Sequence, residues 1–355
     1  MSLRSIYEQI DRRAVVFSRR SGANKSAKHY YDLRQKNGLP IYRLSSAECA
    51  MVDEVWNNKV KSYATHELVA SASGKFDPYV CSELLFRTHI ELAMNDFKLK
   101  FGFSDKNYFD KLFPDVLMPK TIVRNINGVF LDGNYTPINA QEVDRLLNSQ
   151  ERVIVKPSLE NGCGRDVKMY TREMYGKIKT EFKRNYLIQE VLTQHRDVAQ
   201  FNCSSVNVMR VCSLSLNNVV SPVNCAFRCG TEGFVTDNHI TDDGRGMVVV
   251  GVNADGSLKE KGYFSCGETT ETSSNGCAFA GVRLPNFEKA LALTTHIHEQ
   301  LPHFCFMGFD ICFDESGEPV VMEFNIRGPG VLYYQYANGP LFGDRTKEVI
   351  DAFCK

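Results

Sequence analysis

The last two predicted strands of the chain carry polar side chains where a buried hairpin would normally be apolar. Residues 307–330, MGFDICFDESGEPVVMEFNIRGPG, indicate two apolar strands joined by the turn DESGEP. Asp310 stands within the first strand, and Glu323, Asn325 and Arg327 stand at alternate positions along and beyond the second. Side chains at every second position of a strand point to one face. This polar face in an apolar setting indicates a bound cation or anion.

The turn fixes which residues of the two strands face each other. With DESGEP as the turn, Phe313 pairs with Val320, and counting back places Asp310 opposite Glu323. Directly opposed side chains have Cβ atoms about 5 Å apart, and like charges there are destabilising. Such a pair needs a raised pKa or a cation between the two carboxylates. With the side-chain oxygen of Asn325 it forms an all-oxygen set that suits Mg²⁺ better than zinc. The alternative is a solvent-facing hairpin with ordinary surface charges.

Three other segments carry groups that could bind phosphate. Arg327 and the Gly-Pro-Gly turn lie where an anion bound to the predicted metal would sit. Lys156 ends the apolar strand RVIVKPS, and backbone N–H groups of Gly162 and Gly164 could close over phosphate oxygens. This loop lacks the G-x-x-x-x-G-K-[ST] pattern of a P-loop, so a plain hairpin loop is the alternative. Arg210, in NVMRVCSLSL, could contact phosphate or carboxylate in bidentate fashion, or could form a salt bridge on a surface strand.

The strand YLIQEVL is apolar on both faces and is therefore predicted to be central in its sheet. Its end could offer backbone groups and a carboxylate to a flat heterocycle through Gln189, Glu190, Val191 and Leu192. Asp197, a few residues later, could bind a ribose hydroxyl. The alternative is a strand end that carries Glu for solubility.

Two further groups are candidates for substrate contacts. Asn207 is a polar residue in a β-branched segment, and Asn238 and His239 follow Asp237 in a polar loop. The alternatives are a surface strand for Asn207 and, for the loop, a turn that binds nothing.

The spacing of hydrophobic residues divides the chain into two regions of different predicted secondary structure. Residues 1–117 are predicted to be mainly helical, with Ser45 or Ser46 capping a helix that has Glu48 in its first turn. From residue 118 short strands alternate with helices, beginning with the hairpin KTIVRNINGVFLD and its Asn-Gly turn. We therefore expect an α+β fold with mixed or antiparallel sheets.

Composition excludes several classes of protein. Lys plus Arg and Asp plus Glu both number 42, so net charge gives no indication of a nucleic-acid partner. No apolar run approaches the roughly 20 residues of a membrane-spanning helix, and the basic start lacks the apolar core of a secretion signal. The twelve cysteines form no C-x-x-C pair and no zinc-site spacing. We expect a cytoplasmic protein with free thiols and no stable membrane insertion.

Taken in chain order, these features resemble the ATP-grasp superfamily. The order is a lysine on a strand, a Gly loop, a hinge strand with Glu, Asn-x-x-Arg, then Asp on one strand and Glu-x-Asn on the next. The segments SDKNYFDKLF, MPKTIVRNINGVF, VNVMRV and YANGPLFGD are similar to the sugar-transfer-associated branch, which is found near surface-polysaccharide genes. The resemblance runs from about residue 104 to the end. It implies an ATP-grasp fold whose α+β subdomains, 118–192 and 193–355, clasp ATP beside the helical region 1–117.

The resemblance also implies a role for each matching position. The nucleotide would be bound by Lys120, Lys156, Gly162, Gly164, Gln189, Glu190, Val191, Leu192 and Asp197, and Mg²⁺ by Asp310, Glu323 and Asn325. Arg210, Arg327 and Lys156 would act on the transferred phosphate. The loop ENGCGRD departs from the family, which more often has adjacent small residues there.

The activity implied is that of an ATP- and Mg²⁺-dependent carboxylate–amine ligase that forms an amide through an acyl phosphate and releases ADP. Its substrates would be a small carboxylate, a sugar acid or an amino acid, and an amine, for surface or capsular polysaccharide. Positioning and charge neutralisation would suffice without a covalent protein nucleophile. The alternatives are a kinase on the same fold and a nucleotide-binding regulatory module without turnover.

Overall fold

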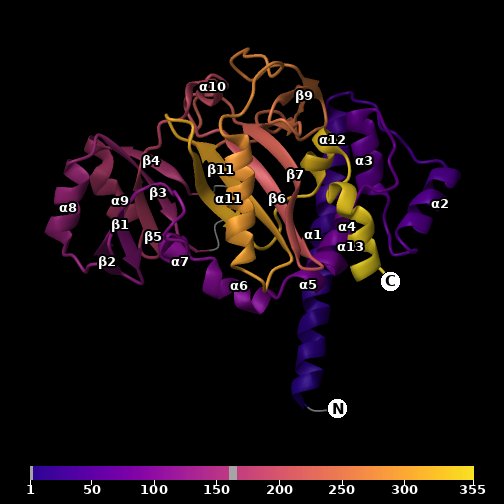
Figure 1. Cartoon of the computed structure of the whole chain (residues 1–355), viewed down its shortest axis with the longest axis horizontal. Helices are drawn as coiled ribbons and strands as arrows, with labels where there is room; N and C mark the ends of the chain where they lie inside the picture. The colour runs from indigo at the N-terminus through magenta and orange to yellow at the C-terminus, as the bar shows by residue number, and fades with distance from the viewer. Residues whose placement is uncertain (1–2, 160–165) are drawn as a thin grey trace.

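The computed structural model describes residues 3–159 and 166–355, and within the first helix it describes side chains from residue 12 onward. Helices surround two antiparallel sheets, and the first helix extends beyond the rest of the molecule (Figure 1). Among the described helices, none is both long enough and apolar enough to cross a membrane.

The region before residue 118 is mainly helical, as predicted. Its elements are α1 (Leu3–Lys36), α2 (Ser46–Val55), α3 (Ala64–Ser73), α4 (Glu83–Leu85), the π-helical turn η1 (Phe86–Ile90), α5 (Glu91–Met94), α6 (Phe97–Phe103), the 3₁₀ turn η2 (Lys106–Tyr108) and α7 (Phe109–Leu112). Ser45 caps α2 and forms a capping box with Glu48, which confirms that prediction.

A five-stranded sheet follows, with the strand order β2-β1-β5-β3-β4. Its strands are β1 (Thr121–Ile126), β2 (Val129–Asp132), β3 (Arg152–Pro157), β4 (Lys168–Thr171) and β5 (Tyr186–Glu190), and its helices are α8 (Ala140–Asn148), η3 (Arg172–Met174) and α9 (Tyr175–Glu181). The predicted hairpin turn at Asn127 and Gly128 is confirmed, and both residues have positive φ, as a two-residue turn of this kind requires. The central position of β5 is also confirmed.

The second sheet has seven strands in the order β10-β9-β8-β7-β6-β11-β12. Its strands are β6 (Val208–Leu216), β7 (Val219–Cys229), β8 (Val248–Val252), β9 (Leu258–Tyr263), β10 (Thr269–Thr270), β11 (Phe306–Phe313) and β12 (Pro319–Asn325). The accompanying helices are α10 (Arg196–Ala199), α11 (Phe287–Glu299), α12 (Leu332–Asn338), η4 (Gly343–Arg345) and α13 (Thr346–Phe353). The strand pairs of the described residues are antiparallel in both sheets.

The two faces of the seven-stranded sheet differ in chemistry. One face packs Phe227 and Phe309 against Ile297 of α11, which crosses the sheet in Figure 1. The other face packs Val249 against Tyr334 of α12. Side chains alternate along a strand, so Arg228, beside Phe227, and Asp310, beside Phe309, point to the α12 face. The candidate site lies on this face.

The register of the closing hairpin confirms one prediction and corrects another. Asp310 lies opposite Glu323, as predicted, but Phe313 pairs with Pro319, one residue earlier than predicted. A β-bulge between Asp310 and Ile311 restores the predicted register toward the open end of the hairpin. The predicted pairing of the two carboxylates is therefore right, although the turn is tighter than predicted.

Asn95, at the end of α5, ties the helical region to this hairpin. Its buried side-chain amide donates to the carbonyl oxygens of Phe306 and Ile326, both at 2.7 Å. Its Oδ1 accepts the Phe306 N–H at 3.1 Å. One side chain therefore satisfies three backbone groups, at the start of β11 and just beyond β12.

Replacing Asn95 with Ala should lower the free energy of unfolding by about 3 kcal/mol, because three buried backbone groups lose their partner. Asn148→Ala, at the exposed end of α8, serves as the matched control and should change it by less than about 0.5 kcal/mol. Urea denaturation followed by circular dichroism measures both. Equal effects of the two substitutions would show that Asn95 does not hold the hairpin.

Candidate active site

Asp310 lies at the centre of the polar face of the seven-stranded sheet and is almost fully buried. The register of β6 and β11 places Arg210 directly opposite it. Arg210 Nε lies 2.6 Å from Asp310 Oδ1 and Arg210 Nη2 lies 2.8 Å from Oδ2, a bidentate ion pair. Arg210 also donates through Nη1 to the carbonyl oxygen of Pro329, in the predicted Gly-Pro-Gly turn. The pair therefore joins three segments: β6, β11 and the turn after β12.

Arg228 on β7 extends this pair into a buried network. Its Nη2 lies 3.2 Å from Asp310 Oδ1, and its Nε donates to Asp237 Oδ2 at 2.9 Å. Its Nη1 donates to the hydroxyl of Tyr334 on α12 at 3.3 Å. Two arginines and two aspartates thus alternate, which balances the charges that burial would otherwise make costly.

The network keeps Asp310 ionised. Burial alone would raise the pKa of Asp310, but the guanidinium groups of Arg210 and Arg228 outweigh burial and hold the pKa below its usual value. For Asp237, burial dominates and raises the pKa, and the Arg228 charge offsets it only in part. In the structure each carboxylate pairs with a cation of its own, Asp310 with the two guanidinium groups and Glu323 with Lys106, and a cation between the two carboxylates stays a prediction.

Glu323, opposite Asp310, pairs with a different cation. Lys106 Nζ lies 3.2 Å from Glu323 Oε1, and Lys106 is buried whereas the Glu323 side chain is 30% exposed. Lys106 begins the short helix predicted from SDKNYFDKLF, and Asp105 caps that helix by accepting the Asn107 N–H at 3.0 Å. Glu323 therefore has one side toward solvent and the other toward a buried ammonium.

Lys156 on β3 supplies a second buried ammonium close to Lys106. The Lys106 N–H donates to the carbonyl oxygen of Ser158 at 3.0 Å, which fixes the start of η2 against the end of β3. Burial, together with the Lys106 charge, lowers the pKa of Lys156 to about 8, against the opposing effect of Glu323.

A small cavity lies where the five-stranded sheet meets β12. Its volume is about 20 Å³, enough for about one water molecule. It is lined by Lys106, Phe109, Asp110, Met118, Pro119, Thr121, Lys156, Leu187, Gln189, Val321 and Met322. The candidate site therefore continues from the carboxylates to the predicted hinge strand β5.

Asn325 joins the carboxylates, whereas Arg327 lies on a different surface. Asn325 Nδ2 donates to Asp310 Oδ2 at 3.5 Å, and Glu323 lies directly opposite Asp310. The three predicted metal ligands therefore share one face of the sheet. Arg327 is exposed, and its Cζ lies 5.7 Å from the centre of the Phe97 ring on α6. Within residues 3–159 and 166–355, no group of three or more His, Cys, Asp or Glu side chains could hold a metal. A metal here would depend on two carboxylates and an amide.

The predicted nucleotide contacts lie mostly at the end of β5. Lys120 is exposed and pairs with Glu190, with Nζ and Oε1 2.8 Å apart. Gln189 is buried, and its amide donates to the carbonyl oxygen of Pro119 at 3.0 Å. Val191 and Leu192 follow the strand and are half-buried, and Asp197 lies half-exposed on α10 beside His195. Gly162 and Gly164 lie outside the described residues.

The predicted substrate contacts are dispersed. Asn207 is fully buried and its amide donates to the carbonyl oxygens of Val198 at 3.0 Å and Asn202 at 2.8 Å, so it stabilises the loop before β6. Asn238 is half-buried, and the ring of His239 stacks on Phe234 at 3.6 Å between centroids. A substrate role for these residues stays a prediction.

Four residues of the site were not among those predicted: Lys106, Arg228, Asp237 and Tyr334. Lys106 and Arg228 could have been found from the sequence. Lys106 lies in the family-like segment SDKNYFDKLF, and Arg228 is a cation within the apolar segment CAFRCG. The sequence shows Asp237 in a polar loop but does not indicate that Arg228 is its partner. Tyr334 carried no signal, since its contact depends on how α12 packs on the sheet.

Comparison with known families and structures places this fold. The family model for sugar-transfer associated ATP-grasp proteins matches residues 174–351. No curated protein matches the chain.

Solved structures with partial similarity include three ligases or synthetases, each 14% identical to this chain. The ATP-grasp ligase PsnB, complexed with a phosphomimetic variant of its minimal precursor, Mg and ADP, has a TM-score of 0.42, with 77% of this chain and 66% of that chain covered. D-alanine–D-alanine ligase from Bacillus anthracis, complexed with ATP, also scores 0.42, with 74% and 70% covered. D-cycloserine synthetase DcsG scores 0.39, with 73% and 71% covered.

These three structural similarities are weak, and the family match is the finding that identifies the chain. The matched residues include the whole seven-stranded sheet and the network around Asp310. Because the match spans half of the sequence, this protein belongs to the sugar-transfer associated ATP-grasp family and has its α+β fold.

Proposed function

We propose that this protein is an ATP- and Mg²⁺-dependent ligase that activates a carboxylate as an acyl phosphate and joins it to an amine. The observation that carries the proposal is the Asp310–Glu323 pair, which lies with Asn325 on one face of the sheet among buried cations. Membership of the ATP-grasp family supports it.

The residues present fit a magnesium ion by the chemistry of their donors. Asp310, Glu323 and Asn325 offer only oxygen atoms as ligands, which Mg²⁺ prefers. A bound Mg²⁺ would supply charge neutralisation of the phosphate oxygens at this position.

The charge balance of the site favours a polyanion. Four cationic side chains face three carboxylates: Lys106, Lys156, Arg210 and Arg228 against Asp237, Asp310 and Glu323. Four minus three leaves one positive charge, and a divalent cation would bring the excess to three. Such an excess in a partly buried site suits a triphosphate.

The base of the nucleotide would occupy the region beside β5. Because the cavity there holds about one water molecule, we expect the five-stranded sheet to move away from β12 when a nucleotide binds. Backbone groups of Val191 and Leu192, with Glu190, would contact adenine, and Asp197 would contact the ribose. Lys120, which is exposed beside Glu190, would contact the nucleotide from the solvent side.

The reaction needs no covalent bond to the protein. A carboxylate oxygen of the substrate attacks the γ-phosphorus of ATP, which forms the acyl phosphate and releases ADP. The amine nitrogen then attacks the acyl carbon, loses a proton to solvent and expels inorganic phosphate. Arg210 and Arg228 hold positive charge where both steps develop negative charge, and Lys156 does so from the other sheet.

The family description supports a substrate class for the proposed reaction. A sugar acid or amino acid and an amine, used in the cytoplasm for surface polysaccharide, fit the description of the family as associated with sugar transfer.

Glu323→Gln should lower phosphate release by about 10²- to 10³-fold with folding kept, because it removes one charged ligand from the proposed metal site. Release is measured with ATP and Mg²⁺ against a panel of uronic acids, amino acids and amines. Glu318→Gln, on the same hairpin but paired with Lys289 at the surface, is the matched control and should retain activity.

Three outcomes of this screen would contradict the metal assignment or the ligase activity. Equal activity of Glu323→Gln and the wild type would remove the metal assignment. ADP formed with a stable phosphorylated product and no free phosphate would indicate a kinase. Nucleotide that binds but is never consumed across the whole panel would indicate a regulatory module.

Affinity for ATP should fall as pH rises above 8, because Lys156 must be charged to bind phosphate. Its lowered pKa of about 8 leaves the ammonium mostly charged at pH 7 and mostly neutral at pH 9. Calorimetric titration from pH 7 to 9.5 should show the Kd rising about tenfold per pH unit above 8.

Two variants separate Lys156 from other titrating groups. Lys156→Arg should bind with a nearly flat pH profile, since arginine stays charged. Lys106→Met should move the midpoint upward, because it removes the neighbouring charge that helps to lower the Lys156 pKa. A wild-type Kd that does not change between pH 7 and 9.5 would contradict the role of Lys156.

A further inference from the structure

The first helix has a charge opposite to that of the rest of the chain. Helix α1 contains nine Lys and Arg against three Asp and Glu, a net charge of +6. Since the whole chain has 42 of each kind, the remaining residues have 33 against 39, a net charge of −6. Neutrality of the whole chain therefore conceals a strongly basic helix.

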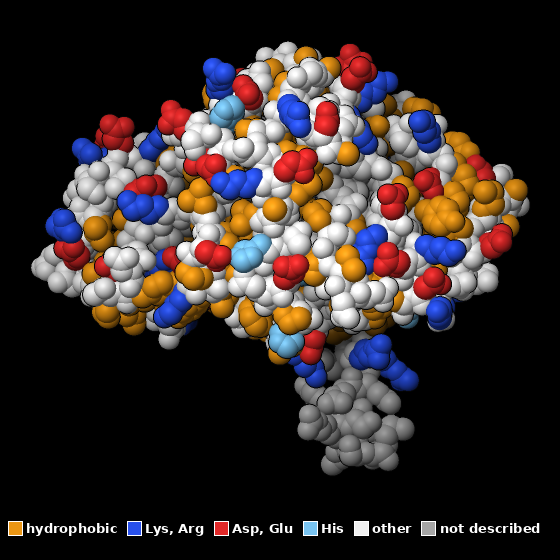
Figure 2. All heavy atoms as spheres, viewed as in Figure 1, with side chains coloured by type: hydrophobic (Ala, Val, Ile, Leu, Met, Phe, Trp, Pro, Cys, Tyr) orange, Lys and Arg blue, Asp and Glu red, His pale blue; other side chains and the backbone are white. Residues whose placement is uncertain are grey.

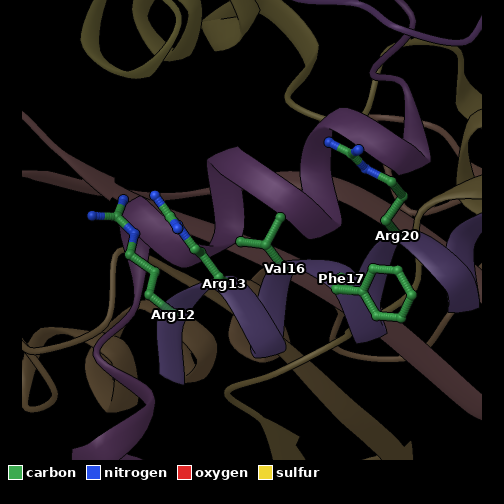
Figure 3. A pocket seen from close by; sticks show the side chains of 5 residues that line it. All are labelled: Arg12, Arg13, Val16, Phe17 and Arg20. Carbon is green, nitrogen blue, oxygen red and sulfur yellow. The ribbon is translucent and has the colours of Figure 1, made fainter. Parts of the chain in front are cut away.

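The outer side of α1 presents this charge together with aromatic surface. Arg12, Arg13 and Arg20 are exposed, and Phe17 between them is 74% exposed (Figure 3). Together with Val16 they line an open hollow of about 410 Å³. On the inner side Arg19 is buried and pairs with Glu91 at 2.7 Å, which fixes the orientation of the helix. This contact turns Phe17 and Arg13 outward, whereas Arg12, seven residues before Arg19 and on the same side of the helix, is exposed because α1 extends beyond the rest of the molecule there.

Helix α6 adds the same chemistry next to α1. The Cζ atom of Arg19 lies 4.8 Å from the centre of the Phe97 ring, so the two helices are in contact. On α6, Lys98 is exposed, and Leu99 and Phe101 are 38% and 64% exposed. We define the basic-aromatic surface as the exposed side chains of Arg12, Arg13, Phe17, Arg20, Lys98, Leu99 and Phe101.

The basic-aromatic surface lies at the lower edge of the molecule in the view of Figure 1, where α1 leaves the body beside α6. Figure 2 shows Lys and Arg side chains around the described base of the projecting helix. The hollow in this surface is open and is lined by residues of one helix only, so it suits a broad anionic surface better than a ligand enclosed in a pocket.

We propose that the basic-aromatic surface docks on an anionic lipid bilayer. Cationic side chains meet phosphate groups of lipids without a matching cavity, and phenylalanine rings lose water by entering the interface. A second copy of the chain is disfavoured because two such surfaces would oppose like charges. An acidic protein would have to cover two separated aromatic rings as well as the charges.

Docking here would place the candidate active site near the bilayer. Arg327, two residues beyond Asn325, lies over the same Phe97 ring that Arg19 contacts. The basic-aromatic surface therefore adjoins the end of β12, the strand that carries Glu323 and Asn325. The proposal depends on surface chemistry alone and is independent of the proposed ligase reaction.

Sedimentation of the full chain with vesicles tests the proposal. We expect binding to vesicles of phosphatidylcholine with 30% phosphatidylglycerol, weak binding to phosphatidylcholine alone, and release as salt is raised. The triple variant Arg12→Glu, Arg13→Glu, Arg20→Glu should bind at least a hundredfold less, since the loss of each positive charge costs about fivefold and the new carboxylates add repulsion. Phe17→Ser with Phe101→Ser should bind about tenfold less at equal charge.

A second triple variant controls for net charge. Lys75→Glu, Lys177→Glu, Lys261→Glu changes the same number of exposed charges elsewhere and should alter binding by less than about threefold. Equal loss in both triple variants would overturn the specific surface, and absence of binding to either vesicle would overturn docking on lipid. A dimer in analytical ultracentrifugation that the Phe17 and Phe101 substitutions dissociate, without vesicle binding, would identify a second copy as the occupant.

Discussion

The bidentate ion pair between Arg210 and Asp310 organises the candidate site. It is buried, so either partner alone would carry an uncompensated charge, and removal of one would cost about 3–5 kcal/mol. The pair links β6 to β11, and the further contacts of Arg210 with Pro329 and of Arg228 with Asp310 bring in the closing turn and β7. Four segments from different parts of the sequence therefore meet at one carboxylate. Apolar side chains on this face would hold the same segments together equally well. The buried charges therefore indicate a face that binds ions.

Two sheets supply the site with different kinds of charge. The seven-stranded sheet provides the carboxylates and the rigid arginines, which are fixed by strand register and by contacts on both sides. The five-stranded sheet provides Lys156, whose pKa is lowered by burial and whose charge is therefore sensitive to its surroundings. Lys106 lies between the two sheets and touches both through Glu323 and Ser158. A ligand that separates the sheets would change the surroundings of both lysines while leaving the arginine network in place.

Local sequence rules predicted most of the elements and the pairing of two residues of the candidate site. Asp310 and Glu323 could be paired from the sequence because a hairpin ties register to turn length, and a bulge absorbed the one-residue error in the turn. Arg228 and Asp237 could not be paired, since eight residues separate them, nearly all beyond the end of β7, and only the folded loop brings the two side chains to 2.9 Å. Arg327 continues the alternation of Glu323 and Asn325 in the sequence, but the strand ends at Asn325 and Arg327 turns toward Phe97. Strand periodicity predicts direction only while the strand lasts.

We propose that Asp310 and Glu323 hold one divalent cation between them. Crystals grown with Mn²⁺ and a non-hydrolysable ATP analogue test this most directly, because anomalous scattering locates the metal without reference to the protein. We expect a metal peak within about 2.3 Å of a carboxylate oxygen of each residue, with phosphate oxygens completing the coordination. A nucleotide bound at full occupancy with no metal between these two carboxylates, or with the metal held by other residues, would contradict it.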